Sequence, residues 1–428
     1  MCPGLSAATV TVTETRTHKE VVVPDFLSEA RAIEAEITQL RHELHEHPEL
    51  GLNLPWTQGR VLEALAGLPL EITLGTRSTS ITAVLRGGAA PADIAERPVV
   101  LLRGDMDGLP IPEATGMPFS SKIEGLMHGC GHDIHTATLT GAAKILSAHA
   151  AELPGDVVFM FQTAEEIFQG ARAQIADGVL DAAGKRVDRA FGMHVMSSTI
   201  EHGMYVSRHG TCMAAADILK VDIIGKGGHG SAPHSAIDPV PVMAEVILAL
   251  QTMVARKFFV FDPVVVTVGV ANAGGAANVI PEQCHIECSI RTFSVANRAK
   301  MEAMAQEVIA GVCAAHGCRA EMDWIPGVPP TVNTPEVVDF AAQQIEAVLG
   351  EGRYRPMTEP YVGSEDFSEV LLEVPGCFIF YSGLPADRDL ATATFNHSAT
   401  AWFDDCVIGE AMAVYCQLAW ASLFELAE

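Results

Sequence analysis

The sequence has few basic residues for its length. Its 428 residues include 27 lysines and arginines against 53 aspartates and glutamates, which gives a formal net charge of −26. Proteins that bind nucleic acids or anionic membranes need basic surfaces, so this balance argues against both kinds of partner. A small anionic substrate is not excluded, because an arginine and bound metal ions can make the potential inside a cleft positive.

The sequence also lacks the features of an exported or membrane protein. Residues 1–24 have neither the basic start nor the apolar run of a signal peptide, and we expect them to form a poorly ordered tail. We expect no segment that approaches the length of a membrane span. The ten cysteines show no spacing typical of a disulfide framework, which indicates reduced and mostly buried thiols. We therefore expect a cytoplasmic enzyme.

The hydrophobic pattern predicts an α/β fold with two domains. Residues 25–212 and 325–428 are expected to form a discontinuous catalytic domain, with a mixed or parallel sheet flanked by helices. Residues 213–324 between them follow a β-α-β-β-α order, which predicts an inserted α+β domain of two layers. A chain of this length has room for both.

Three predicted buried strands deliver polar residues at their carboxyl ends, where α/β folds place their chemistry. The strands cover residues 99–103, 157–161 and 190–195, and the polar side chains are Asp107, Glu165, Glu166 and His194. This recurrence is stronger evidence for a site than any one of the segments alone.

The segment Met127–His135 carries the most informative pattern in the chain. Its Cys130 and His132 stand two residues apart, between glycines that let the backbone bend closely around an ion. Thiolate and imidazole suit zinc and neighbouring transition metals. The segment therefore predicts a metal site.

The candidate ligands are numerous enough for two divalent ions that share a bridging ligand and hold a hydroxide between them. These candidates are Cys130, His132, Glu166, His194 and His397. Glu165 stands beside Glu166 and remains available as a base that moves a proton from water to the leaving amine.

Several polar residues have more ordinary interpretations. Asp133 precedes a predicted helix, so a helix N-cap and a contact beside a metal ligand both stay open. His45 lies shortly before Pro48 at a helix end, where we expect a solvated or capping side chain. Glu365 and Asp366 are expected to be ordinary charges of a loop that lines the cleft.

A series of motifs resembles the M20 amidohydrolases, most closely the N-acyl-amino-acid, hippurate and auxin-conjugate hydrolases. The resemblance extends over nearly the whole chain from about residue 36. The motifs lie at residues 103–110, 127–135, 165–166, 227–234, 278–281, 363–367 and 396–398.

The resemblance implies a role for each matching residue. The five candidate ligands match the metal ligands of the family, with Cys130 as the bridge, and Glu165 matches the general acid/base. Asp107 matches a carboxylate that orients a metal-bound histidine. The implied cofactors are two divalent ions per subunit, with zinc favoured over manganese, cobalt or nickel.

On the inserted domain, the resemblance implies residues that hold the substrate. His229 matches a histidine that is often supplied to the partner subunit's site, where it stabilises a developing oxyanion. Asn278 and Arg291 match positions that hold the α-carboxylate of the substrate. The resemblance thus implies a homodimer or dimer-based oligomer, in which the inserted domain is both lid and dimerisation domain.

The implied reaction is hydrolysis of the amide bond of an N-acyl-L-amino acid to a carboxylate and a free amino acid. The segment Ile167–Gly170 is bulkier than a glycine-rich loop and is expected to narrow the acyl pocket. A dipeptidase or carboxypeptidase of the same family remains an alternative. A non-catalytic metal-binding protein is a further one, although it would not need Glu165 as a base.

Overall fold

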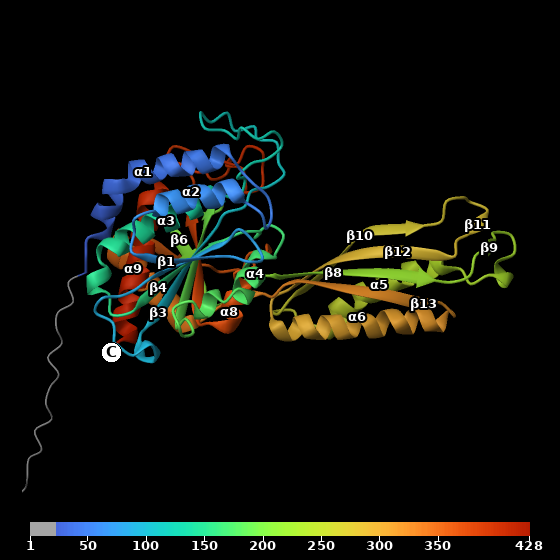
Figure 1. Ribbon diagram of the computed structural model, residues 1–428. Helices are drawn as coiled ribbons and strands as arrows, with labels where there is room; N and C mark the ends of the chain where they lie inside the picture. Colours follow the sequence, from blue (N-terminus) through green and yellow to red (C-terminus); the bar gives the residue numbers. More distant parts are fainter. Residues whose placement is uncertain (1–22) are drawn as a thin grey trace, which may run out of the picture.

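The structure is a computed structural model that describes residues 23–428. Over this range, Figure 1 shows a larger part built on one sheet and an elongated second part that extends away from it. The tail predicted for residues 1–24 lies outside the described residues, except for its last two.

The larger part is built on a mixed sheet. Its strands are β1 (Leu70–Leu74), β2 (Ile81–Leu85), β3 (Val99–Asp105), β4 (Asp156–Gln162), β5 (Arg189–Met196), β6 (Tyr205–Ser207), β15 (Tyr354–Pro356) and β16 (Gly376–Ser382). Their order in the sheet is β1-β2-β4-β3-β5-β16-β6-β15. The central strands β4, β3, β5 and β16 are parallel, and their apolar residues are buried on both faces, as in sheets that helices cover on both sides.

Helices cover both faces of this sheet and enclose two hydrophobic cores. The larger core lies under α1 (Phe26–Glu46), α2 (Pro55–Leu65), α3 (His132–Ala148), α7 (Pro335–Leu349) and α9 (Val407–Leu426). The smaller core lies under α4 (Gly170–Ala176) and α8 (Ser368–Glu373). Short 3-10 helices occur at Ile94–Glu96, Ala150–Glu152, Val179–Asp181 and Pro233–Ser235.

The three strands predicted to carry polar residues at their ends are confirmed as β3, β4 and β5. Strand β3 lies between the other two and runs parallel to both. Because parallel strands end at the same edge of a sheet, their carboxyl ends bring the predicted polar residues to one place.

The elongated part is an antiparallel sheet of order β10-β12-β8-β13, with two helices packed on one face (Figure 1). Its elements are β8 (Ala215–Ile224), α5 (Pro239–Lys257), β10 (Val264–Ala273), β12 (Gln283–Thr292), α6 (Val295–Ala315) and β13 (Arg319–Val328). The sequence predicted the first five in order but missed β13, although Arg319–Trp324 alternate polar and apolar residues as a half-buried strand does. The predicted domain boundary at 324/325 falls inside β13, and we propose that the inserted domain extends to Val328.

Two small ladders mark the ends of the inserted domain. Strands β7 (Gly210–Met213) and β14 (Thr331–Asn333) pair where the domain joins the larger part. Strands β9 (Gly228–His229) and β11 (Val279–Ile280) pair at its far end (Figure 1).

Helices α5 and α9 are long and apolar enough to span a membrane, contrary to the expectation that no segment approaches this length. Helix α9 is a core helix, buried under α1, α3 and α7, and this position explains its composition. Helix α5 buries only one stripe against the four-stranded sheet. Much of its apolar surface therefore has no partner within residues 23–428.

A buried ion-pair network joins the start of α3 to α1. The carboxylate of Asp133 lies 2.6 Å from Nε of Arg41 and 2.9 Å from Nδ1 of His45. The N-cap of α3 is Gly131 in the left-handed conformation, so the N-cap interpretation of Asp133 is wrong. The solvated or capping role expected for His45 is wrong as well: α1 continues to Glu46, and the four-residue spacing places His45 beside Arg41 on the buried face.

We expect Asp133→Asn to lower the free energy of unfolding by about 3 kcal/mol at pH 7, because the buried Arg41 loses a charged partner. Burial opposes ionisation of Asp133, but Arg41 and His45 outweigh it and hold the pKa of this carboxyl well below its ordinary range. The stabilisation is therefore complete above about pH 4 and is lost as the pH falls towards the lowered pKa.

Urea unfolding followed by tryptophan fluorescence, at pH 7 and at pH 3, measures both effects. The control is Asp405→Asn, which removes a half-exposed partner of Arg41 at 2.8 Å and should cost less than about 1 kcal/mol. Equal losses in the two variants at pH 7 would contradict the prediction for Asp133.

Candidate functional site

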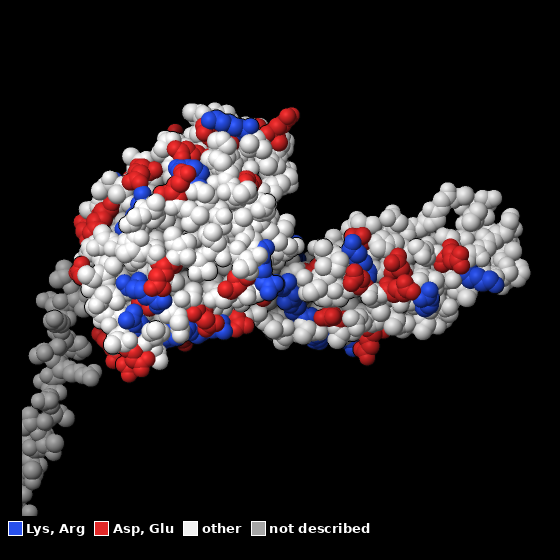
Figure 2. Space-filling view, viewed as in Figure 1, with Lys and Arg blue, Asp and Glu red and all other residues white. Residues whose placement is uncertain are grey.

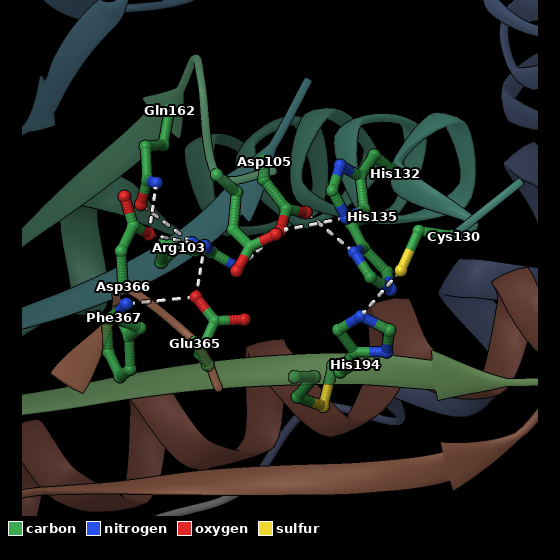
Figure 3. A network of polar contacts seen from close by, with 12 residues as sticks. Arg103, Asp105, Cys130, His132, His135, Gln162, His194, Glu365, Asp366 and Phe367 are labelled. Atoms are coloured by element: carbon green, nitrogen blue, oxygen red, sulfur yellow. Dashed lines mark hydrogen bonds and ion pairs between the residues drawn. The ribbon is translucent and has the colours of Figure 1, made fainter. Parts of the chain in front are cut away.

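The structure brings all five predicted metal ligands together at the carboxyl edge of the large sheet. Sγ of Cys130 lies 3.3 Å from Nε2 of His194 and 3.2 Å from Nε2 of His397. Oε1 of Glu166 lies 3.5 Å from Nε2 of His397 and 3.8 Å from Nε2 of His132. Figure 3 shows three of the ligands, from α3, β5 and the loop before α3, facing the same space.

Two groups of these ligands share one residue, and a third group of His132, Glu165 and Glu166 lies beside them. Cys130, His132 and His194 make one group, and Cys130, Glu166 and His397 make the other. Within each group, the candidate ligand atoms lie within 4.8 Å of one another. A residue common to two such groups occupies the place of a bridging ligand between two ions.

The ring nitrogens of two ligands are oriented by backbone carbonyls. Nδ1 of His132 lies 2.8 Å from the carbonyl oxygen of Asp107, and Nδ1 of His194 lies 2.8 Å from that of Val195. Because a carbonyl only accepts, each Nδ1 carries a proton and each Nε2 turns its lone pair to the cluster. Nε2 of His132 and Oε1 of Glu166 are buried without a hydrogen-bond partner in the described part of the chain. The donor set thus fits divalent metal ions.

The pKa shifts of the acidic side chains also indicate that the site binds a cation. Burial raises the pKa of the Cys130 thiol far above its ordinary value, and the neighbouring Glu166 adds to this effect. Burial also raises the pKa of Glu166 to about 7. Both side chains need positive charge beside them to bind in their ionised forms, and a divalent cation supplies it.

Asn396 joins the loops that carry the ligands. Its Nδ2 donates to the carbonyl oxygens of Val195 at 3.0 Å and Cys130 at 3.3 Å. Its Oδ1 accepts from the backbone N–H of Ser197 at 2.9 Å. The sequence placed Asn396 in a motif next to His397 but gave it no role, because its partners belong to distant segments.

Asp107 positions the pair of glutamates. Its two carboxylate oxygens accept hydrogen bonds from the backbone N–H groups of Glu165 at 3.0 Å and Glu166 at 3.1 Å. The same carboxylate lies 3.5 Å from Nδ1 of His132. One residue therefore sets the relative positions of the predicted base and two predicted ligands.

A buried network around Arg103 lies beside the ligands, and sequence reasoning missed it (Figure 3). The Arg103 guanidinium donates to Glu365 at 2.6 Å, to Asp105 at 2.6 Å and to Gln162 at 2.9 Å, and Asp366 lies 3.4 Å away. Glu365 and Asp366 are fully buried here, so the expectation of ordinary loop charges was wrong. An arginine inside the apolar strand 99–103 was the available signal, since a buried guanidinium requires acidic partners.

This network borders the predicted base. Carboxylate oxygens of Glu165, Glu365 and Asp366 lie within 4.8 Å of one another, and all three side chains are buried. Burial, followed by the charges of Glu365 and Glu166, raises the pKa of Glu165 well above its ordinary range. A raised pKa suits a carboxyl group that must both accept and return a proton near neutral pH.

A cavity of about 880 Å³ lies over the cluster, between the two parts of the molecule. Figure 2 shows the surface hollowed there, with few charged side chains on the visible walls. Glu165 and four of the predicted ligands line the cavity from the larger part, and Arg291 lines it from β12. Much of the remaining lining is apolar, including Met196, Met213, Val265, Phe293, Phe380 and Phe395.

The family model described as Peptidase family M20/M25/M40 matches residues 101–421 of the chain. The chain belongs to the M20 peptidase family. The M20 protein is similar to the hippurate hydrolase of Campylobacter jejuni, at 33% identity over 93% of this chain and 98% of the relative. It is also similar to thermostable carboxypeptidase 1 of Saccharolobus solfataricus, at 34% identity over 84% of this chain and 88% of the relative.

A solved structure from Bacillus subtilis, described as a dinuclear metal binding peptidase from the M20 family, has the same fold. It is 31% identical and covers 92% of this chain and 99% of its own, with a TM-score of 0.77. Together with the ligand cluster, these matches establish a metal-dependent hydrolase that binds divalent metal ions.

Two predicted site residues of the M20 hydrolase lie away from the cluster. His229 is in β9, and Asn278 directly precedes β11, so both lie at the far end of the inserted domain (Figure 1). They are exposed and adjacent, since the N–H of Gly230 donates to the carbonyl oxygen of Asn278 at 2.8 Å. Arg291 and Asn278, predicted to hold the same carboxylate, therefore stay apart within one chain.

Proposed function

We propose that this M20 hydrolase cleaves the amide bond of N-acyl-L-amino acids, which releases a carboxylate and a free amino acid. The observation that carries the proposal is Arg291, a cation in the cavity that holds the ligand cluster, which has no ion-pair partner among residues 23–428 and donates only to the hydroxyl of Ser364. An arginine in this position suits the α-carboxylate that remains when the amino group of an amino acid is acylated.

Cys130, His132, Glu166, His194 and His397 would hold the metal ions. Two divalent ions, with zinc favoured over manganese, cobalt or nickel, would supply Lewis-acid polarisation of the carbonyl and a water molecule of lowered pKa.

Glu165 is the proposed general acid/base. It is buried, lines the cavity and is held in place by the bond from its backbone N–H to Asp107. Its carboxylate takes a proton from the attacking water and returns it to the nitrogen of the leaving amino acid. Asp107 does not move a proton in this scheme and acts by positioning Glu165.

Arg291 orients the substrate from the inserted domain. Its guanidinium donates to Oγ of Ser364 at 3.1 Å, a contact between the inserted domain and the loop of the larger part that lines the cavity. Binding of the α-carboxylate would therefore hold both domains against the substrate, and closure of the inserted domain would exclude water.

His229 is proposed to act in the site of a second copy of the chain. The backbone N–H of Ser231 donates to Nδ1 of His229 at 3.2 Å, so Nε2 carries the proton of the neutral ring. Nε2 is thus a donor on an exposed side chain at the far end of the inserted domain, where it can reach a neighbouring molecule. Its proposed acceptor is the oxyanion that forms in the partner subunit, with Asn278 beside it as a second contact to the substrate.

Two features of the inserted domain suit a homodimer. Helix α5 exposes apolar residues such as Leu248, and β10 is an edge strand of the four-stranded sheet. An edge strand next to an apolar helix is a favourable surface for self-association. The partner proposed for this surface is a second copy of the chain. A cytoplasmic location remains a prediction.

A carboxypeptidase or dipeptidase is the second candidate, favoured by the similarity to the Saccharolobus carboxypeptidase. Such an enzyme would use the same ligands and base but would act on substrates with a free amino group. Matched dipeptides with free and blocked amino groups distinguish the two functions.

The test is release of amino acids from a panel of N-acetyl, N-benzoyl and long-chain N-acyl amino acids. The protein is assayed as isolated, after chelation and after addition of single metal ions. We expect activity to disappear with chelation and to return with at least one divalent ion. Cleavage of free dipeptides alone would favour the second candidate, and no cleavage by the folded, metal-loaded protein would refute both.

A further inference from the structure

A second cavity of about 540 Å³ adjoins the one that holds the ligand cluster. Residues 167–169 and Arg172 of the larger part line one side of it, and strands β8, β10, β12 and β13 of the inserted domain line the other. Phe168, Ser289 and Arg291 line both cavities. These three residues therefore form a partition between two adjoining spaces.

The second cavity collects large apolar side chains that are partly exposed. Ile167 is 50% exposed, Ile218 is 43% exposed and Ile325 is 37% exposed, and all three line this cavity. Ile218 and Ile325 lie directly opposite each other on β8 and β13, which makes them a cross-strand pair. Apolar residues from two domains that converge on one cavity fit an apolar ligand group.

The charged side chains of the second cavity differ in whether they have a partner. Asp217 pairs with Arg298, Arg172 with Glu369, and Glu287 with His285. Arg291 has no such partner within the described residues, and its hydrogen bond to Ser364 engages a neutral hydroxyl. The cavity thus offers one free cation at the partition and an apolar wall beyond it.

The partition is held in a fixed position relative to Glu165. The backbone N–H of Phe168 donates to the carbonyl oxygen of Glu165 at 2.8 Å, and that of Gln169 donates to Ala164 at 3.1 Å. Phe168 adopts φ +56°, a left-handed conformation that is costly for an aromatic residue. The tight turn after the glutamates therefore holds Phe168 between the two cavities.

We propose that the second cavity binds the side chain of the substrate's amino acid and selects large apolar side chains. This inference rests on the proposed function. With the α-carboxylate on Arg291 and the scissile carbonyl at the ligand cluster, the acyl group stays in the first cavity. The Cα atom then lies at the partition, and its side chain enters the second cavity beside Ile218 and Ile325. The bulky segment Ile167–Gly170 accordingly shapes the amino-acid subsite as well as the acyl pocket.

The experiment compares kcat/KM for glycine, leucine and phenylalanine conjugates, in parallel N-acetyl and N-benzoyl series. For the wild-type protein we expect the leucine and phenylalanine conjugates to exceed the glycine conjugate by at least about tenfold. The double variant Ile218→Ser/Ile325→Ser should lower this ratio by about tenfold. The matched control is Ile72→Ser, an isoleucine 39% exposed on β1 that lines neither cavity, and it should keep the wild-type ratio.

A second variant keeps the test independent of the folding of the double variant. Ile325→Glu places a carboxylate in the second cavity and should raise the rate of the lysine conjugate relative to the leucine conjugate by at least about tenfold. Equal rates for glycine and leucine conjugates in the wild-type protein would overturn the inference and leave the proposed function intact. The inference would also be overturned if circular dichroism showed that these variants are folded and their rate ratios were unchanged. Absence of metal-dependent release from every conjugate would instead refute the proposed function.

Discussion

Replacing Glu165 with glutamine is expected to lower kcat by about 10²- to 10⁴-fold, the usual contribution of a general acid/base. Glutamine has nearly the same shape and keeps the backbone bond to Asp107, but it cannot take a proton from water. The loss should therefore fall on kcat, whereas KM should change little. Steady-state kinetics on the best substrate of the N-acyl panel measure both constants.

Metal content separates this effect from simple damage to the ligand cluster. We expect Glu165→Gln to bind as much metal as the wild-type protein, because the two groups that share Cys130 are complete without Glu165, and its own group keeps His132 and Glu166. Mass spectrometry of the dialysed protein measures the metal. Glu165→Asp, which keeps a carboxylate but withdraws it, should lie between wild type and Glu165→Gln in kcat. If a metal-loaded Glu165→Gln protein kept more than about a tenth of the wild-type kcat, Glu165 would not be the base.

Replacing His229 with alanine is expected to lower kcat by about 10²- to 10³-fold, the range for loss of one oxyanion donor. The side chain is exposed, so the variant should fold normally. A residue so far from the cluster of its own chain should affect catalysis only if it reaches the site of another chain. The loss should therefore be repaired by a second protein that supplies an intact histidine.

Co-expression of Glu165→Gln and His229→Ala chains with different affinity tags tests the exchange. In a mixed dimer, one site has Glu165 from its own chain and His229 from its partner, whereas the other site lacks both. Random pairing should recover about a quarter of the wild-type activity. Pairing Glu165→Gln with the double variant Glu165→Gln/His229→Ala should recover none. Purified mixed dimers without activity would show that His229 is not shared.

The sequence predicted the ligand cluster well because its residues lie at strand ends and in short motifs. The strand pattern predicted β3, β4 and β5, and parallel strands deliver their carboxyl ends to one edge. Hydrophobic periodicity likewise predicted five of the six elements of the inserted domain. Both predictions depend on patterns within short segments, or on the rule that parallel strands end at the same edge of a sheet.

Long-range polar partners were beyond sequence reasoning. Arg103 and Glu365 are 262 residues apart, and Arg41 and Asp133 are 92 apart, so no local pattern connects them. Nor could the sequence place Arg291 at a partition between two cavities, since that position depends on how the two domains pack. Strand β13 was missed although its first six residues alternate between polar and apolar, because Ile325, Pro326 and Gly327 interrupt that alternation.

The join between the two domains has a consequence for product release. Within residues 23–428 the chain crosses between them only near Met213 and Val328, beside the small ladder of β7 and β14. The metal ligands belong to the larger domain and Arg291 belongs to the inserted domain. The proposed substrate would therefore contact both domains at once and hold them together. Hydrolysis of the amide bond breaks this connection, because the carboxylic acid then contacts the larger domain and the amino acid contacts the inserted domain. The reaction itself would then allow the two domains to separate, and each product could leave the open cleft.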